Sequence, residues 1–327
     1  ENDLRKGLTS YLDGLSNIIF HSDLGSMQQK VERLSFICKN FSSNFSANVN
    51  TVLKSAKLAK ADLCTEVVYE MPELQGIIGS VYAELEKLPL DVVTSIKEHY
   101  SPVGPSDNCP SIPESALLSF ADKMDSLVGF LSIGLKPSGS KDPFGIRRAC
   151  LGIIRITVEK KIRLSLKTVI EDSIKSYGSQ KFKLKYKNSL ICSLAIDFIY
   201  ERFKFYLLEK NIPQDRIESV LSVEKNYDLY NSFQKIVNLN KFLSTKEGLK
   251  LISILKRVRR ILYLEEKKVG ITYNGKVKKS LFKSFEEKGL YDACLKNSTL
   301  IENAIQTEQY EKALKYFQDI KIQLDNF

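Results

Sequence analysis

The basic side chains with the clearest chemistry lie close together in the second half of the sequence. They are Lys256, Arg257, Arg259 and Arg260. On a helix, Lys256 and Arg260 are one turn apart, and the other two residues flank them. Lysine and arginine form charge-assisted hydrogen bonds with phosphate oxygens, so this cluster suits a polyanion such as nucleic acid. The alternative is a solvated, lysine-rich surface that serves only solubility.

A second pair of basic residues, Arg148 and Arg155, flanks a glycine on one face of a predicted helix. Gly152 leaves a gap between the two arginines, where a phosphate or a partner backbone could approach closely. The alternative is that both arginines form ion pairs inside the protein, because such networks often imitate functional sites. The carboxylates that we consider for this pairing are Asp122, Asp125 and Glu159.

The sequence offers few ligands for a metal ion. Its two histidines are His21 and His99, and neither has a neighbouring ligand at metal-binding spacing, which nearly excludes a histidine-rich site. We therefore expect no metal. The six cysteines are far apart and form no Cys-x-x-Cys pair, which favours buried thiols in a reducing, cytosolic compartment.

Helices are the elements that must position these residues. Apolar residues recur at helical spacing through residues 4–45. Pro113 and Pro143 each suit a first helical turn, where the missing N–H is no loss, and Asp142 is then a natural N-cap. The apolar stripe of the helix that follows Pro143 would consist of Ile146, Ala149, Cys150 and Ile153.

The basic helix has its own start signal, because Ser244 and Glu247 form a capping box. We expect its buried stripe to consist of Leu251, Leu255, Val258 and Leu262. Upstream, lysines alternate with Phe, Leu and Tyr through residues 181–187, and this period of two fits a short strand or an extended arm. The predicted fold class is nevertheless all-α.

Composition and charge point to a globular protein with an anionic partner. The chain has 327 residues, 43% of them hydrophobic, which suffices for a full core and allows two domains. Residues 1–150 hold 15 Lys and Arg against 18 Asp and Glu, whereas the remaining residues hold 34 against 21. Nucleic acid fits this asymmetry better than a membrane does, because no segment reaches the roughly 18 apolar residues of a spanning helix.

Several short motifs are too specific for generic helical sequence. They are Lys-Ala-Asp-Leu-x-Thr at 60–65, Glu-Met-Pro-Glu-Leu-Gln-Gly at 70–76, Glu-His-Tyr-x-Pro at 98–102, Ala-Asp-Lys-x-Asp-x-Leu-Val-Gly at 121–129, Lys-Pro-x-Gly-Ser-Lys-Asp-Pro-Phe at 136–144 and Arg-Arg-Ala at 147–149. Together they resemble the bacterial glycyl-tRNA synthetase β subunit family. Met71 departs from that pattern, because the family usually has Phe there.

The resemblance implies that residues 1–162 form an HD-like helical domain. In other proteins this fold often houses metal-dependent phosphohydrolysis, which needs histidines and aspartates, including a His-Asp pair. Neither histidine here precedes an aspartate, and carboxylates without imidazoles make a poor transition-metal site. The residues left for a degenerate pocket are Asp62, Asp122 and Asp125. We expect the fold to be retained and hydrolysis lost, with an HD-like metal-dependent phosphohydrolase as the alternative function.

The second half of the chain resembles the family more loosely. Residues 190–327 are similar to its helical anticodon-binding-type domain, and residues 163–189 would form a basic connector. We expect this domain to be truncated at its C-terminus, and the chain, which begins without Met, to be part of a longer protein. If the function is that of the family, we expect tRNA contacts by Arg202, Lys256, Arg257, Arg259 and Arg260, with Arg148 and Arg155 as further candidates. Two of these depart from the family pattern, because Arg259 and Arg260 replace a more usual small residue and asparagine.

The function implied by the resemblance is that of a β subunit fragment of glycine-tRNA ligase in the cytoplasm. Such a fragment would bind tRNA-Gly and support the α subunit in an α2β2 assembly. It would carry no catalytic residue and bind no cofactor, because ATP with Mg would act at the α subunit. A non-catalytic helical scaffold is a further alternative, in which the tyrosines serve packing.

Overall fold

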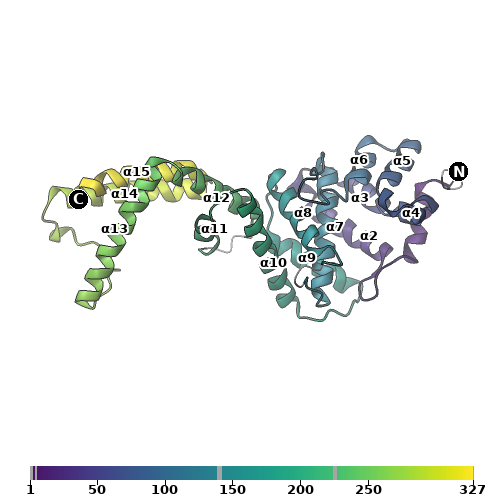
Figure 1. Cartoon of the computed structure of the whole chain (residues 1–327), viewed down its shortest axis with the longest axis horizontal. Helices are drawn as coiled ribbons and strands as arrows, with labels where there is room; N and C mark the ends of the chain where they lie inside the picture. The colour runs from purple at the N-terminus through teal and green to yellow at the C-terminus, as the bar shows by residue number, and fades with distance from the viewer. Residues whose placement is uncertain (1–2, 4–5, 138–141, 224–226, 327) are drawn as a thin grey trace. The chain divides into compact units, whose positions relative to one another are not determined.

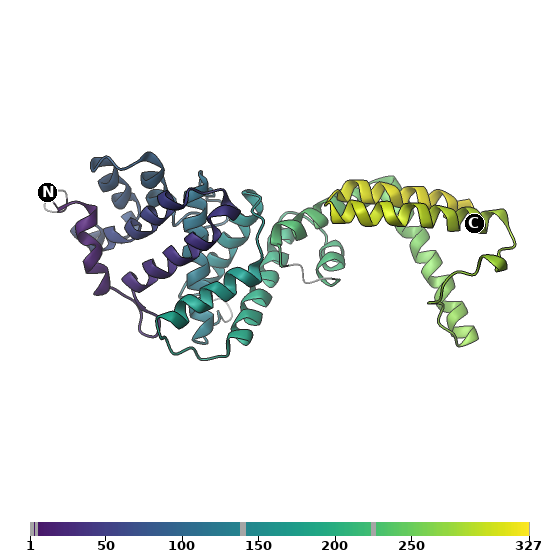
Figure 2. The ribbon, with the colours of Figure 1, turned by 180° about the vertical axis from the view of Figure 1, so that it is seen from behind.

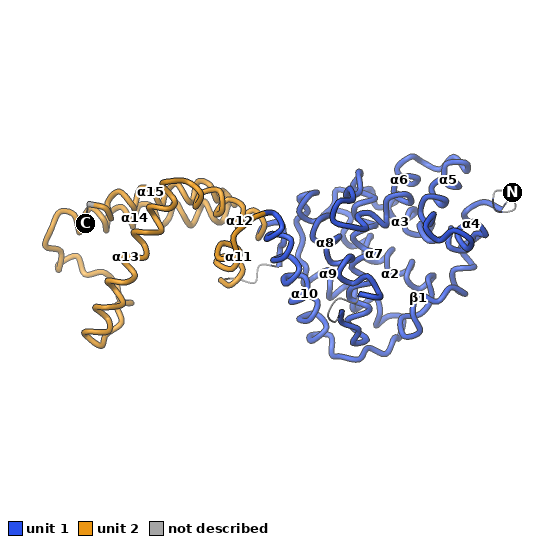
Figure 3. The backbone as a smooth tube through the Cα atoms, viewed as in Figure 1, with its two compact units in different colours: residues 1–210, 225–231 blue, residues 211–224, 232–327 orange. Residues whose placement is uncertain are grey.

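The structure is a computed structural model that describes residue 3 and residues 6–137, 142–223 and 227–326. Its helical content confirms the all-α prediction (Figure 1). The chain forms two compact units, unit 1 with residues 1–210 and 225–231 and unit 2 with residues 211–224 and 232–327 (Figure 3). Leu4 and residues 138–141 of the predicted Lys-Pro-x-Gly loop lie outside the described residues.

Unit 1 contains the first two thirds of the helices. In chain order its elements are η1 (Leu8–Ser16), β1 (Ile19–His21), β2 (Gly25–Ser26), α2 (Met27–Phe45), α3 (Val49–Leu58), η2 (Ala61–Cys64), α4 (Glu66–Glu70), η3 (Pro72–Leu74), α5 (Ile77–Leu85), α6 (Leu90–Glu98), α7 (Pro113–Ser132), α8 (Ile146–Glu159), α9 (Leu166–Ser179) and α10 (Asn188–Glu209).

Helix α7 is the centre of unit 1. It begins at Pro113, as predicted, and nearly all its later residues are buried. The reason is its position, because α2, α3, α6, α8, α9 and α10 all pack against it (Figures 1 and 2). A helix surrounded in this way buries polar as well as apolar side chains, and each buried polar group then needs a partner.

The prediction of helix throughout residues 4–45 is wrong between η1 and α2, where the chain forms a small antiparallel hairpin. Strands β1 and β2 pair Ile19 with Ser26, and Gly25 turns the chain with a left-handed φ of 81°. Ser26 then caps α2, accepting a hydrogen bond from the backbone N–H of Gln29. Apolar spacing alone did not reveal this turn, which depends on the glycine.

The start of α8 differs from the prediction, because the helix begins at Ile146 and not at Pro143. Gly145 precedes it in the left-handed conformation, with φ 66°. Asp142 nevertheless caps the helix, since its carboxylate accepts hydrogen bonds from the backbone N–H groups of Ile146 and Arg147 at 2.9 and 3.0 Å. The sequence therefore identified the capping side chain but placed the first turn too early.

Unit 2 is built on longer helices. Its elements are α11 (Gln214–Leu221), most of α12 (Leu229–Leu243), α13 (Lys246–Val269), η4 (Lys279–Leu281), α14 (Phe285–Gln306) and α15 (Tyr310–Asn326). Thr245 caps α13 in place of the predicted Ser244. The predicted stripe of α13 is buried only at Leu251, while Leu255 and Leu262 are 48% and 42% exposed. Within unit 2, α15 is the main neighbour of α13, so much of the helix has no partner to bury it.

Residues 181–187, the predicted arm, form a turn, a short irregular stretch and a bend, and no strand within the described part of the chain. The four lysines of the arm are exposed, whereas Phe182, Leu184 and Tyr186 are partly buried, as the period of two predicted. The compact units divide the chain differently from the three predicted regions, because α9 and α10 both belong to unit 1. The predicted domains stay a prediction. No described helix is long and apolar enough to cross a membrane.

Candidate functional site

Two carboxylates of α7 lie inside unit 1, and cations from other elements hold both. Asp122 and Asp125 are 8% and 0% exposed. The ammonium group of Lys30, on α2, lies 2.9 Å from Asp122 Oδ1 and 3.0 Å from Asp125 Oδ2. Lys60, which precedes η2, places its ammonium group 3.0 Å from Asp122 Oδ2. Each carboxylate thus has a cation on at least one oxygen.

Arg33 completes the pairing of Asp125. Its Nε and Nη2 atoms donate to the two carboxylate oxygens at 2.7 and 3.2 Å, a bidentate arrangement. The guanidinium lies 4.0 Å from the ring centre of Tyr177, whose hydroxyl donates to the backbone carbonyl of Asp125 at 3.0 Å. Asp125 is therefore bound on both carboxylate oxygens and held at its backbone.

These ion pairs set the charge of the two carboxylates. Burial on its own would raise the pKa of Asp122, but the ammonium groups of Lys30 and Lys60 hold it well below the usual 3.8. Burial likewise opposes ionisation of Asp125, whereas Lys30 and Arg33 lower its pKa. Both groups are anions at neutral pH, already neutralised by side chains of the same chain.

Sequence reasoning found Asp122 and Asp125 but missed their partners. A signal was present, because Lys30 and Arg33 are three residues apart on α2, as the two aspartates are on α7. Two packed helices with matching spacings can pair their charges in register. The sequence alone does not say which helices pack, so the match became visible only in the fold.

The third pocket candidate, Asp62, lies on η2 and faces backbone groups. Its Oδ2 accepts hydrogen bonds from the N–H groups of Gly76 and Gly79 at 2.6 and 3.1 Å, and burial raises its pKa. The fully buried His99 shares a short contact of 2.6 Å between Nδ1 and the carbonyl of Ile96, so Nδ1 carries the proton. Across the described residues, no group of three or more His, Cys, Asp or Glu side chains is placed to hold a metal ion.

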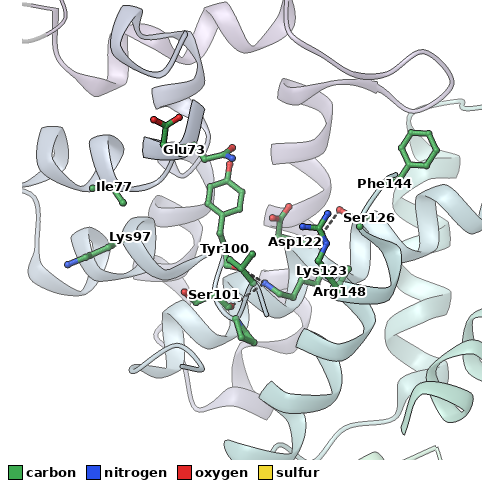
Figure 4. Close-up of a pocket in the computed structure, with 15 residues that line it drawn as sticks. Glu73, Ile77, Lys97, Tyr100, Ser101, Asp122, Lys123, Ser126, Phe144 and Arg148 are labelled. Carbon is green, nitrogen blue, oxygen red and sulfur yellow. Dashed lines mark hydrogen bonds between the residues drawn. The ribbon is translucent and has the colours of Figure 1, made fainter. Parts of the chain in front are cut away.

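The gap predicted at Gly152 is filled from within the protein. A Cβ atom at this position would lie 2.4 Å from Cε of Lys123, so the glycine provides space for the lysine and not for a phosphate. Lys123 crosses α8 here and donates to the carbonyls of Tyr100 and Ser101 at 2.8 and 3.2 Å (Figure 4).

Gly152→Ala is therefore expected to destabilise the chain by about 1–3 kcal/mol, because the new methyl group must displace a buried lysine with several hydrogen bonds. Chemical unfolding followed by circular dichroism would measure this. Gly178→Ala is the matched control, since Gly178 also lies in a helix and has nothing within 4 Å of an added Cβ. A similar small effect for both variants would contradict the packing role of Gly152.

The two arginines of α8 have different surroundings. Arg155 is 8% exposed, pairs with Glu159 at 2.9 Å and donates to the carbonyl of Gly104 at 2.9 Å. It therefore fits the ion-pair alternative, with Glu159 as the partner. Arg148 is exposed and pairs with no carboxylate of the described chain; it lines a cleft of about 530 Å³ together with Asp122 (Figure 4).

The remaining candidates lie on two helices. Arg202, on α10 in unit 1, is half-buried, pairs with Glu201 at 2.8 Å and lies 4.7 Å from the ring centre of Phe205. The other four share α13 in unit 2, and all are exposed: Lys256, Arg257, Arg259 and Arg260. No ion pair or hydrogen bond engages these four side chains within the described residues, so α13 presents a cationic surface.

Comparison with known proteins shows that the chain belongs to a class of aminoacyl-tRNA synthetase subunits. A family model described as "Glycyl-tRNA synthetase beta subunit" matches residues 1–222. The match covers more than half of the chain, and the motifs described above lie within it. The chain belongs to the glycyl-tRNA synthetase β subunit family.

Curated relatives agree over the whole chain. It is 37% identical over 327 residues to the glycine–tRNA ligase beta subunit of Rickettsia bellii, and 33% identical over 332 residues to that of Ruegeria sp.. Each alignment includes 100% of this chain but only 45% and 46% of the relatives. The chain thus spans about half the length of the curated relatives it matches.

Proposed function

We propose that this chain is the part of a glycine–tRNA ligase β subunit that contacts tRNA-Gly and supports the α subunit. The relatives carry the name of this ligase subunit, and the chain aligns with them along its whole length. In this proposal the α subunit uses ATP with Mg to attach glycine, within a cytoplasmic α2β2 assembly. The chain itself contributes binding and no catalytic residue.

The observation that carries the proposal is the cationic surface of α13. Lys256, Arg257, Arg259 and Arg260 are exposed and free of internal ion pairs within the described residues. Unpaired cations on a helix bind a phosphate backbone by releasing its counterions. The neighbouring Tyr263 is 61% exposed and offers a ring on which an unstacked base can pack.

We further propose that residues 1–162 form the HD-like domain and that residues 190–327 belong to an anticodon-binding-type domain. The family match supports the first assignment and the basic α13 supports the second. Phosphohydrolase activity is disfavoured, because Lys30, Lys60 and Arg33 occupy the carboxylate oxygens that a metal would need.

Replacing Lys256, Arg257 and Arg260 together with alanine is expected to weaken tRNA-Gly binding at least about tenfold at roughly 0.1 M salt. Each lost phosphate contact also reduces the slope of log affinity against log salt, by about 0.7–0.9. Filter binding across a salt series measures both quantities.

The control for this variant replaces Lys276, Lys288 and Lys296, which are also exposed and lie in unit 2 outside α13. It removes the same charge from the chain. Equal loss of tRNA binding by the two triple variants would show that α13 contributes only through the net charge of the chain. Unchanged tRNA binding by the α13 variant would refute its role.

A further inference from the structure

The cleft of unit 1 combines a charged floor with walls of different chemistry. Asp122 and Lys123 of α7 form part of the floor, beside Tyr100 (Figure 4). One wall includes Phe144, which precedes α8, and Arg148, which lies on α8. The other wall includes Glu73 and Lys97. Its volume of about 530 Å³ is within the range of about 300–1,000 Å³ typical of small-molecule sites.

Cations outnumber carboxylates in the cleft lining. The cationic side chains there are Lys97, Lys123 and Arg148, and the carboxylates are Glu73 and Asp122. Burial and the neighbouring Lys60 lower the pKa of Lys123 to about 8, so it is still mostly charged at neutral pH. Because water screens partly buried charges poorly, this excess favours an anion as the ligand of the cleft.

The rim supplies cations without internal partners. Arg148 and Lys97 are exposed, and within the described residues neither forms an ion pair or a side-chain hydrogen bond. Arg148 suits a phosphate, because its planar guanidinium can donate two parallel hydrogen bonds. Glu73 on the opposite wall repels an anion, which favours a position beside Arg148.

An aromatic ring lies on the same wall as Arg148. Phe144 stacks on Phe130 with ring centres 4.8 Å apart and planes inclined by 27°, and it remains 41% exposed. Internal stacking fixes the ring while leaving part of it open at the cleft. A partly exposed aromatic ring and an arginine that line one cleft suit a base and its phosphate, because bases stack on aromatic rings and guanidinium groups bind phosphate.

We propose that this cleft binds a nucleotide without hydrolysing it, with the phosphate on Arg148 and the base against Phe144. The same chemistry fits a free nucleotide and an unpaired nucleotide of tRNA. Binding of a tRNA nucleotide in the cleft depends on the proposed function, whereas binding of a free nucleotide does not. Asp122 takes no metal in this proposal, because Lys30 and Lys60 already bind its carboxylate.

The test uses the complete 327-residue chain with AMP, inorganic phosphate and tRNA-Gly as probes, by calorimetric titration and filter binding. Arg148→Glu is expected to weaken AMP binding about tenfold or more, because it places a like charge beside the phosphate. Arg147→Glu is the matched control, since it makes the same charge change on α8 outside the cleft lining. Phe144→Leu is expected to weaken AMP but not inorganic phosphate.

Competition between AMP and tRNA-Gly distinguishes a free nucleotide from a tRNA nucleotide as the ligand of the cleft. Displacement of tRNA by AMP supports a tRNA nucleotide in the cleft, and AMP binding that is sensitive to Arg148→Glu but leaves tRNA bound supports a free nucleotide. The proposal is overturned if Arg148→Glu changes neither AMP nor tRNA binding beyond the Arg147→Glu control. The α13 variants test the proposed function separately, since their failure leaves the AMP result unaffected.

Discussion

Replacing Asp125 with alanine is expected to lower the free energy of unfolding by about 3–5 kcal/mol. The substitution leaves the Arg33 guanidinium without its bidentate partner and removes one of the two carboxylates bound to Lys30. Both cations stay buried, at 1% and 2% exposure, so water cannot replace the lost interaction. Chemical unfolding monitored by far-ultraviolet circular dichroism measures the change.

Asp172→Ala is the control for this prediction. Asp172, on α9, pairs with the exposed Lys175 at 2.9 Å and accepts a hydrogen bond from Asn40 at 3.0 Å, and losing both costs about 1–2 kcal/mol. If Asp125→Ala does not fold, Asp125→Asn preserves the shape and some hydrogen bonds and can be measured instead. Equal costs at positions 125 and 172 would show that the buried cluster contributes little to stability.

Acidification is expected to destabilise the chain in two stages. Burial, assisted by Lys60, lowers the pKa of His99 well below its usual 6.5. Below about pH 6.5 the unfolded chain therefore binds a proton that the folded chain does not, which costs about 1.4 kcal/mol per pH unit. The second stage begins near pH 4, because the pKa values of Asp122 and Asp125 lie below 3.8 in the folded chain.

Unfolding measured at a series of pH values would resolve the two stages. Both have the same sign, since in each the unfolded state takes up protons first as the pH falls. Asp62 acts in the opposite direction, because burial raises its pKa. His99→Gln should remove the first stage and leave the second. If the free energy of unfolding falls with pH equally steeply in His99→Gln and in the unchanged chain between about pH 6.5 and 5, His99 is not the source of the first stage.

Local sequence signals predicted much of the fold. Pro113 identified the start of α7, Asp142 identified the cap of α8, and the alternation at residues 181–187 matched the observed exposure. These features depend on a few neighbouring residues, whose preferences are written in the sequence. Gly25 carried a similar signal for the hairpin, but the surrounding apolar pattern favoured helix.

Long-range features were the ones that the sequence could not supply. The interpretation of Arg155 left two alternatives open; its partner Glu159 is one turn away on the same helix, but its burial and its contact with the carbonyl of Gly104 come from packing between distant segments. Gly152 was expected to leave a gap, but Lys123 comes from another helix to fill it. On α13 the apolar stripe was expected to be buried at Leu255, yet a stripe indicates which face is apolar and not whether a neighbour covers it.

The pairing of Asp122 with Lys30 and Lys60 also determines whether this buried carboxylate needs an ion from solution. An ion recruited from solution ties folding to the free concentration of that ion, and a chelator can then unfold the protein. Ammonium groups on α2 and before η2 are tethered to the same backbone and arrive whenever the helices pack. The charge of Asp122 is therefore balanced by side chains of its own chain, without an ion from solution.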